Sequence, residues 1–107
     1  LESLDRFLKN KRELASEYLS FFNNKGIKFR KEMPNTTANY WLMAIELENK
    51  KERNLFLDST NKDGIMTRPI WRLMFKLPMF SEFYRDNQKN AIFLEERIVN
   101  IPSSVRK

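Results

Sequence analysis

The sequence predicts an α+β domain of layered α/β type: a small, mainly antiparallel sheet, helices over one face of it, and a long helix at the N-terminus. Two patterns along the chain predict this class. Apolar residues recur every three or four positions in some stretches, and shorter apolar or alternating runs stand between them. A chain of 107 residues, 41% apolar and 32% charged, is expected to form one folded domain over residues 1–107.

The first expected element is a long amphipathic helix over residues 1–24. Its apolar stripe consists of Leu4, Phe7, Leu8, Leu14, Ala15, Tyr18, Leu19 and Phe22. Asn23, Asn24 and Gly26 should end the helix, because glycine adopts the left-handed conformation of a helix C-terminus without a steric penalty.

Two strands are expected next. Residues 27–32 (IKFRKE) alternate between apolar and charged side chains, which predicts a short strand with one face in water. After a loop at 33–39, residues 40–48 (YWLMAIELE) are rich in aromatic and apolar side chains and form the strongest strand candidate. The first half of that strand is expected to be buried on both faces.

A second helix is predicted over residues 49–64, with Asn49 as its N-cap and Gly64 at its end. Three apolar residues are expected on its inner side: Leu55, Phe56 and Leu57. Residues 65–68 should form a third strand. This strand is expected to end or lie at the sheet edge at Pro69, because proline has no N–H to donate.

The last third of the chain begins with residues 73–86, an irregular segment with three Phe, two Met and one Tyr, which should pack against something. A helix is expected from Asn87, with Ala91, Leu94, Glu95 and Ile98 on roughly one side. Residues 98–102 (IVNIP) should then form a closing strand, and residues 103–107 should fray.

Several chemistries are excluded by composition. The chain has no cysteine and no histidine, so it has no disulfide, thiol nucleophile or imidazole base, and no metal site is expected. Two glycines are too few for a dinucleotide or nucleoside-triphosphate loop. No apolar run approaches the roughly 18 to 20 residues that span a bilayer, and residues 1–11 are not a signal peptide. We therefore expect a cytoplasmic protein without a membrane partner, and a chain cut from a longer one, since it begins at Leu1.

The net charge of +6 and the pI of 9.7 raise the possibility of nucleic-acid binding. Lysine and arginine are interleaved with glutamate and aspartate along the chain, which favours solvated helix faces over one basic patch. The alternative is a small basic nucleic-acid-binding module that uses Arg68, Trp71 and nearby lysines.

Arg68 and Trp71 are the candidate site residues. Arg68 follows a strand and precedes a proline, and its planar guanidinium suits a carboxylate or phosphate, although it could instead pair with a surface glutamate. Trp71 and Trp41 could stack on bases or sugars, or serve as core or interface anchors. Glu95 and Glu96 are neighbours on a helix and point about 100° apart, so both are expected at its surface. No full catalytic set is evident.

Three segments together resemble a known family: ANYWLMAIEL (38–47), NKDGIMTRPIWRLMFKLPMF (61–80) and NAIFLEERIVNIPSS (90–104). They are similar to the C-terminal part of the DegT/StrS family, the pyridoxal-phosphate-dependent nucleotide-sugar aminotransferases of fold type I. Residues 1–22 resemble the helix that links the large and small domains of that family. The text TRPIW is most similar to members that aminate a 4-keto-6-deoxy sugar, including the legionaminic acid pathway type.

The resemblance implies a small domain that works with a large cofactor domain of the same chain and with a homodimer partner. It implies glutamate as amino donor and a nucleotide-linked sugar as substrate, faced by Arg68 and Trp71. The family's Schiff-base lysine lies in the large domain, and no lysine here matches it. This chain alone is therefore expected to hold no catalytic or pyridoxal phosphate (PLP)-binding residue. As an isolated piece it would expose an apolar surface at Phe75, Met79, Phe80 and Phe83.

Overall fold

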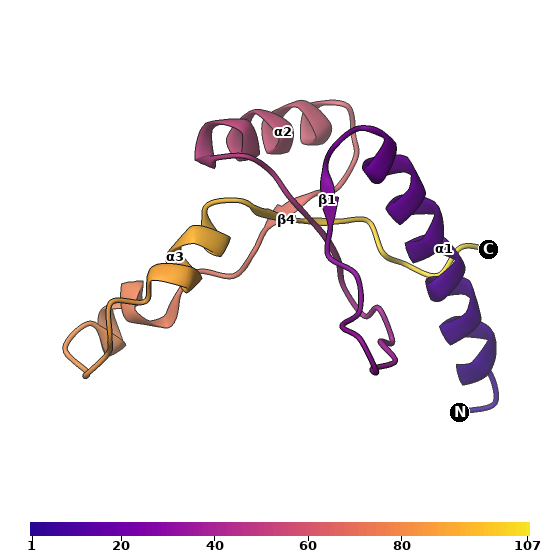
Figure 1. Ribbon diagram of the computed structural model, residues 1–107, viewed down its shortest axis with the longest axis horizontal. Helices are drawn as coiled ribbons and strands as arrows, with labels where there is room; N and C mark the ends of the chain where they lie inside the picture. The colour runs from indigo at the N-terminus through magenta and orange to yellow at the C-terminus, as the bar shows by residue number, and fades with distance from the viewer.

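A computed structural model describes residues 1–107 (Figure 1). In chain order the elements are α1 (Leu4–Asn24), β1 (Lys28–Phe29), β2 (Met43–Glu46), α2 (Lys50–Lys62), β3 (Arg68–Pro69), the 3₁₀ helices η1 (Met74–Lys76) and η2 (Pro78–Phe80), α3 (Lys89–Glu95) and β4 (Ile98–Ile101). The four strands form one sheet in the order β1-β2-β4-β3, and every neighbouring pair is antiparallel. The predicted α+β class with an antiparallel sheet is confirmed.

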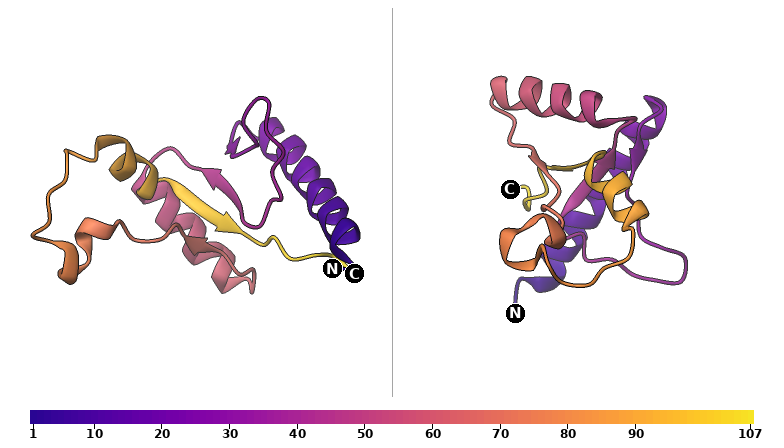
Figure 2. Two further views of the ribbon diagram at one scale, coloured as in Figure 1. Left: turned by 90° about the horizontal axis from the view of Figure 1, so that it is seen from below. Right: turned by 90° about the vertical axis from the view of Figure 1, so that its left-hand side faces the viewer.

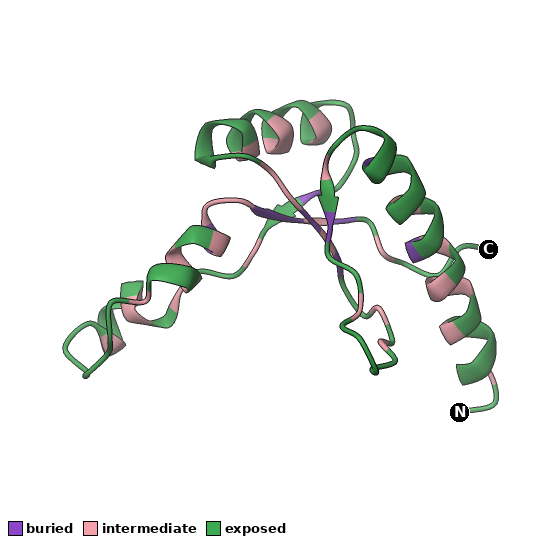
Figure 3. Cartoon of the chain, viewed as in Figure 1, coloured by how far each residue is buried: buried purple, intermediate pink, exposed green.

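The core lies on one face of this sheet. Strand registry places Phe29 opposite Ile45 and Ile45 opposite Val99, and successive side chains of a strand point to opposite faces. These residues form a single buried cluster with four others, Ala15, Phe22, Met43 and Ile101. The buried apolar positions lie on the strands and on the side of α1 that meets them (Figure 3).

Helices α1 and α2 both contribute side chains to this face. Tyr18 of α1 and Phe56 and Leu57 of α2 are half-buried against the cluster. The opposite face carries Lys28, Ala44, Glu46, Asn100 and Arg68, none of them fully buried, and the buried Ile98 at its end. The two longest helices therefore cover one face of the sheet, as predicted, and leave the row Ala44, Asn100, Arg68 accessible.

The helix boundaries follow the capping signals in the sequence. Gly26 and Gly64, just after α1 and α2, have φ of 70° and 80°, in the left-handed region. The Asn49 side chain accepts a hydrogen bond of 2.8 Å from the backbone N–H of Glu52 and so caps α2. The expectation that Leu55 faces inward is wrong, since its side chain is 54% exposed. Residues 55–57 span about 200° of the helix, so not all three can face the sheet.

The strand over residues 40–48 is shorter than predicted, and its first half is not buried on both faces. Tyr40 has a left-handed backbone with φ of 50°, and the N–H of Trp41 bonds back to the Asn39 side chain at 2.9 Å. The chain therefore turns before β2 begins at Met43, and both Trp41 and Leu42 are exposed. β1 is likewise limited to two residues.

β3 confirms the prediction made for Pro69. The strand lies at the edge of the sheet and ends at this residue. It begins later than the sequence suggested, because Ile65 and Met66 lie outside the ladder and are exposed.

Residues 73–88 form an arm that extends away from the sheet, with α3 returning beside it (Figures 1 and 2). The expectation that this apolar segment is packed is met only in part: Leu73, Phe75, Leu77 and Phe80 are half-buried, whereas Met79, Phe83 and Tyr84 are exposed, Tyr84 at 98%. α3 starts two residues later than predicted, after Gln88, which has φ of 52°.

The C-terminal tail does not fray in the expected way. The Asn10 side chain donates to the carbonyl of Arg106 at 3.0 Å and accepts from its N–H at 2.9 Å. Arg106 also forms a two-oxygen contact with Glu17, both at 3.0 Å. Residues 103–107 are therefore attached to α1. None of the helices combines the length and the apolar character needed to cross a bilayer.

Candidate functional site

A groove of about 640 Å³ lies at the β3 edge of the sheet and contains both predicted site residues, Arg68 and Trp71. Three segments that are far apart in the sequence line it, at residues 41–42, 66–72 and 100–104. Edge strand β3 and the end of β4 supply its rigid side, because they are hydrogen-bonded to each other. This volume lies within the range of ordinary small-molecule sites.

Arg68 occupies the exposed side of β3, opposite Asn100 of β4. One of its guanidinium nitrogens donates to the Asn61 side-chain oxygen at 3.3 Å and to the Thr67 carbonyl at 3.1 Å. No carboxylate lies within 4.0 Å of it, so the alternative of a surface pair with glutamate is wrong for this structure. The remaining guanidinium donors are available to an anion or a polar ligand.

Asn61 orients Arg68 and could not be identified from the sequence. Its side-chain N–H₂ donates to the Leu57 carbonyl at 2.8 Å and to the carbonyl and hydroxyl of Thr67 at 3.2 and 3.0 Å. Thr67 is buried, and its hydroxyl also lies 2.6 Å from that of Thr60. These bonds direct the Asn61 oxygen toward Arg68. Only its place in the last turn of a predicted helix could have signalled this role.

Trp71 and Trp41 line the same groove from different segments. Their side chains are 75% and 66% exposed, so the alternative that they belong to the core is wrong within this chain. Two exposed indole rings beside an unpaired guanidinium form a surface suited to a ligand with both apolar faces and anionic groups.

Lys11 of α1 connects two walls of the groove by hydrogen bonds. Its ammonium group donates to the carbonyls of Trp41 at 3.1 Å and Ser103 at 2.6 Å. Burial lowers its pKa. This role could not be predicted from the sequence, because a lysine on an amphipathic helix normally faces solvent.

The loop before Trp41 is held to α1 by an ion pair. Arg12 donates to both carboxylate oxygens of Glu32 at 3.0 and 2.9 Å and to the Ala38 carbonyl at 2.7 Å. Glu32 also accepts from the N–H of Ala38 at 2.8 Å. The side-chain bond from Arg12 and the backbone bond from Ala38 lower the pKa of Glu32 to about 2.

This ion pair predicts a pH dependence of stability. A carboxyl whose pKa is depressed by folding stabilises the fold above its unfolded pKa of about 4.3, and the contribution is lost as the pH falls toward about 2. We expect the unfolding temperature of the wild type to fall more between pH 5 and pH 2 than that of Glu32→Gln. The two proteins should be compared by circular dichroism across that window. Parallel curves would contradict the assignment.

Glu95 is buried, not at the helix surface as predicted. One of its oxygens accepts from the backbone N–H of Leu73 at 2.7 Å, and the other pairs with Lys76. Burial alone would raise the pKa of Glu95, but these bonds and the charges of Lys76 and Arg53 lower it. Residues 73–76 fold back over α3 and cover the Glu95 carboxylate. Glu96 is half-exposed and lies 3.7 Å from Arg97, so the two acids do not form a catalytic pair.

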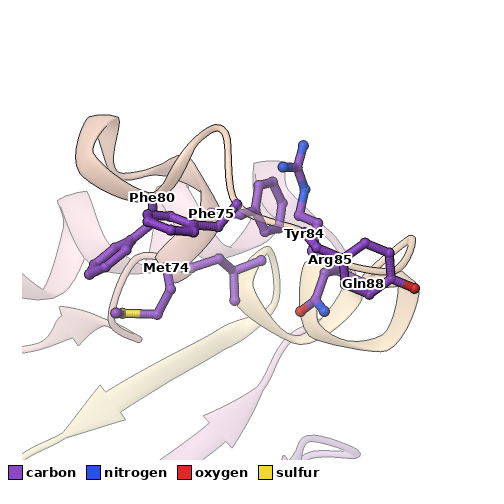
Figure 4. A pocket seen from close by; sticks show the side chains of 8 residues that line it. Met74, Phe75, Phe80, Tyr84, Arg85 and Gln88 are labelled. Atoms are coloured by element: carbon purple, nitrogen blue, oxygen red, sulfur yellow. The ribbon is translucent and has the colours of Figure 1, made fainter.

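A smaller hollow of about 320 Å³ lies within the arm (Figure 4). Its walls are mostly apolar, with Leu73, Met74, Phe75, Phe80, Phe83 and Tyr84 joined by Arg85 and Gln88. The Arg85 guanidinium lies 4.5 Å from the centre of the Phe75 ring, so the one cation there is engaged by the arm itself. This hollow offers few polar groups to orient a substrate.

The chain matches the DegT/DnrJ/EryC1/StrS aminotransferase family over residues 1–106. It is 32% identical over 105 residues to the GDP-perosamine synthase of Escherichia coli O157:H7, and 29% identical over 109 residues to that of Vibrio cholerae. Each match covers 96% of this chain but only 28% and 29% of the relative. The chain thus spans little more than a quarter of the proteins it resembles.

Solved structures show the same fold. The aminotransferase TlmJ from Streptoalloteichus hindustanus superposes with a TM-score of 0.86 at 16% identity, over 97% of this chain and 28% of that one. The sugar aminotransferase CalS13 from Micromonospora echinospora gives 0.77 at 17% identity, over 100% and 28%. The family match over nearly the whole sequence and this shared fold agree, and the chain belongs to the DegT/DnrJ/EryC1/StrS aminotransferase family.

Proposed function

We propose that this chain is the C-terminal small domain of a pyridoxal-phosphate-dependent aminotransferase, and that it supplies one wall of the nucleotide-sugar site. The observation that carries the proposal is the groove in which Arg68 and Trp71 lie together, with no carboxylate paired to the arginine. Relatives matched over about 28% of their length support a role as one domain of a larger protein.

The residues of the groove do not fit a pyridoxal phosphate site of their own. Its charged side chains are Arg68 and Arg72, and it contains no lysine amine that could form an imine with the cofactor. Lys11, beneath it, is held by two carbonyl oxygens. When bound, PLP supplies the electron sink of transamination, and by resemblance the large domain would hold it. The groove fits a role in binding the substrate.

The proposed roles follow from the chemistry of the side chains. The Arg68 guanidinium is oriented by Asn61 and would bind diphosphate or sugar oxygens with its free donors. The Trp71 indole would pack against an apolar face of the ligand and exclude water from it. Because the donors sit on a strand and not on a free loop, they would bind with little loss of conformational freedom.

We also propose a class of substrate for the whole protein. Two relatives are named GDP-perosamine synthase, a name that joins a nucleoside diphosphate to an amino sugar. We extend this to a nucleotide-linked 4-keto-6-deoxy sugar as amino acceptor and glutamate as donor. The narrower assignment to the legionaminic acid pathway type rests on the resemblance of residues 67–71 (TRPIW) alone.

The proposed partners are the large cofactor domain and a second subunit of a homodimer, in the cytoplasm. Support comes from the arm, where Met79, Phe83 and Tyr84 present apolar surface that this chain does not cover. The nucleic-acid alternative has less support, because six of the cations pair with carboxylates within 4.0 Å and so do not form one free patch.

The test uses the whole protein as expressed from its gene. We expect purified protein to show cofactor absorbance in the visible range and to aminate a nucleotide-linked 4-keto-6-deoxy sugar only when glutamate is present. Product formation should be followed by mass spectrometry, with alanine as a control donor. Cofactor-loaded protein that aminates no keto sugar nucleotide would refute the substrate class. Tight, salt-sensitive binding of single-stranded nucleic acid without amination would favour the alternative.

A further inference from the structure

A second pocket, of about 400 Å³, lies at the start of α2 and shares Pro69, Ile70 and Arg72 with the groove. Five of the seven residues that line it are charged: Lys50, Arg53, Arg72, Lys76 and Glu95. We name it the cationic pocket. Four positive side chains and one carboxylate leave three positive charges in excess, in a chain whose cations are otherwise interleaved with acids.

The single carboxylate of the pocket is already occupied. Glu95 accepts from the N–H of Leu73 and pairs with Lys76. It forms an ion pair with Lys76, and no carboxylate lies within 4.0 Å of the other three cations. A merely structural ion cluster would be expected to balance its charges more closely.

The other three cations are free of carboxylates. The side chains of Lys50 and Arg72 make no hydrogen bond and no ion pair within the chain. Arg53 donates to two neutral oxygens, the carbonyl of Glu95 at 2.7 Å and the Asn54 side chain at 3.0 and 3.2 Å. These neutral bonds fix the plane of the Arg53 guanidinium, while two of its N–H groups remain unused.

The position of these charges costs stability in the absence of a ligand. Lys50 and Arg53 both lie in the first turn of α2, where the helix dipole is positive and cations are unfavourable. Like charges that converge on one pocket also repel one another. A ligand with two or more negative charges removes both costs, and planar guanidinium groups match the oxygens of phosphate.

We propose that the cationic pocket binds a phosphate-bearing anion, with Lys50, Arg53 and Arg72 as its ligands. The volume admits a phosphate or diphosphate group. The site does not depend on the proposed amination, because four of its seven residues lie outside the groove: Lys50, Arg53, Lys76 and Glu95. Arg72 contributes to both sites, so a ligand here would sit beside the substrate groove.

Calorimetric titration of the whole protein with inorganic phosphate and with pyrophosphate tests the site. We expect saturable binding of pyrophosphate, and at least tenfold weaker binding by the Lys50→Gln and Arg72→Gln double variant. Binding of phosphate and pyrophosphate with equal affinity would assign a single phosphate group, and tighter binding of pyrophosphate a diphosphate. Both results support the site.

The matched control is Lys51→Gln, which removes a neighbouring charge in the same turn of α2 but outside the pocket. It should bind pyrophosphate like the wild type. Equal losses in the control and the double variant would mean non-specific attraction and overturn the proposal, as would wild-type affinity in the double variant or no binding at all.

Two further measurements distinguish ligand binding in the cationic pocket from a structural role and from the proposed amination. Without ligand, the double variant should unfold at the wild-type temperature or above it, because repulsion is relieved and no hydrogen bond is lost. A lower unfolding temperature would indicate a structural role and overturn the proposal. If the cationic pocket does not bind pyrophosphate, the proposal of glutamate-dependent amination is unaffected. If the protein does not aminate the sugar, the proposal of pyrophosphate binding is unaffected.

Discussion

Replacing Arg68 by alanine in the whole protein is expected to lower kcat/KM for the nucleotide-sugar by about ten- to a hundredfold. The reason is the loss of charge-assisted hydrogen bonds, each of which contributes about 1.5–3 kcal/mol. Since 1.36 kcal/mol corresponds to a factor of ten in rate, the loss of one such bond gives this range. Arg68 makes no ion pair within the chain, so the fold should tolerate the change.

Two variants make the Arg68 prediction specific. Arg68→Lys keeps the charge but not the planar fork, and should recover only part of the loss. Arg6→Ala removes another arginine that has no carboxylate within 4.0 Å, on α1 and outside the groove, and should leave kcat/KM unchanged. Arg68→Ala could instead retain the full kcat/KM for the nucleotide-sugar while its KM for glutamate rises. In that case Arg68 contacts the amino donor, and its assignment to the nucleotide-sugar is wrong.

Replacing Glu95 by alanine is expected to loosen the arm by about 2 kcal/mol, because it leaves the N–H of Leu73 and the ammonium of Lys76 without a partner. Amide hydrogen exchange in the whole protein measures this locally. At 1.4 kcal/mol per factor of ten, the Leu73 amide should exchange roughly thirtyfold faster. Amides of β2, far from the arm, should be unaffected.

Glu95→Gln keeps an oxygen for the N–H of Leu73 and loses only the charge, so its effect should be smaller. Glu96→Ala is the matched control, because its half-exposed pair with Arg97 at 3.7 Å should contribute little. Equal exchange rates in Glu95→Ala and Glu96→Ala would show that the buried carboxylate does not hold the arm.

Local signals predicted much of the architecture. The spacing of apolar residues predicted α1, the Asn49 cap and the left-handed Gly26 and Gly64 predicted helix ends, and Pro69 predicted an edge strand. Each of these depends on the chemistry of one residue and its near neighbours. Arg68 could be placed on the edge strand on the same basis, because it stands directly before Pro69.

Contacts over long sequence distance could not be predicted. Glu95 looks like a helix-surface acid until residues 73–76 fold over it, and Lys11 looks solvated until the carbonyls of Trp41 and Ser103 approach it. Arg106 bonds to the side chain of Asn10, 96 positions earlier, and no local pattern in the sequence indicates this contact. The apolar residues of the arm were expected to pack, but Met79, Phe83 and Tyr84 remain exposed in this chain.

The structure of the whole protein bound to a nucleotide-linked keto sugar tests the central claim most directly. It should show Arg68 within hydrogen-bond distance of diphosphate or sugar oxygens, Trp71 packed against the ligand, and the ligand enclosed between this groove and the rest of the protein. A ligand bound elsewhere, with Arg68 and Trp71 still in solvent, would contradict the claim that this chain forms a wall of the substrate site.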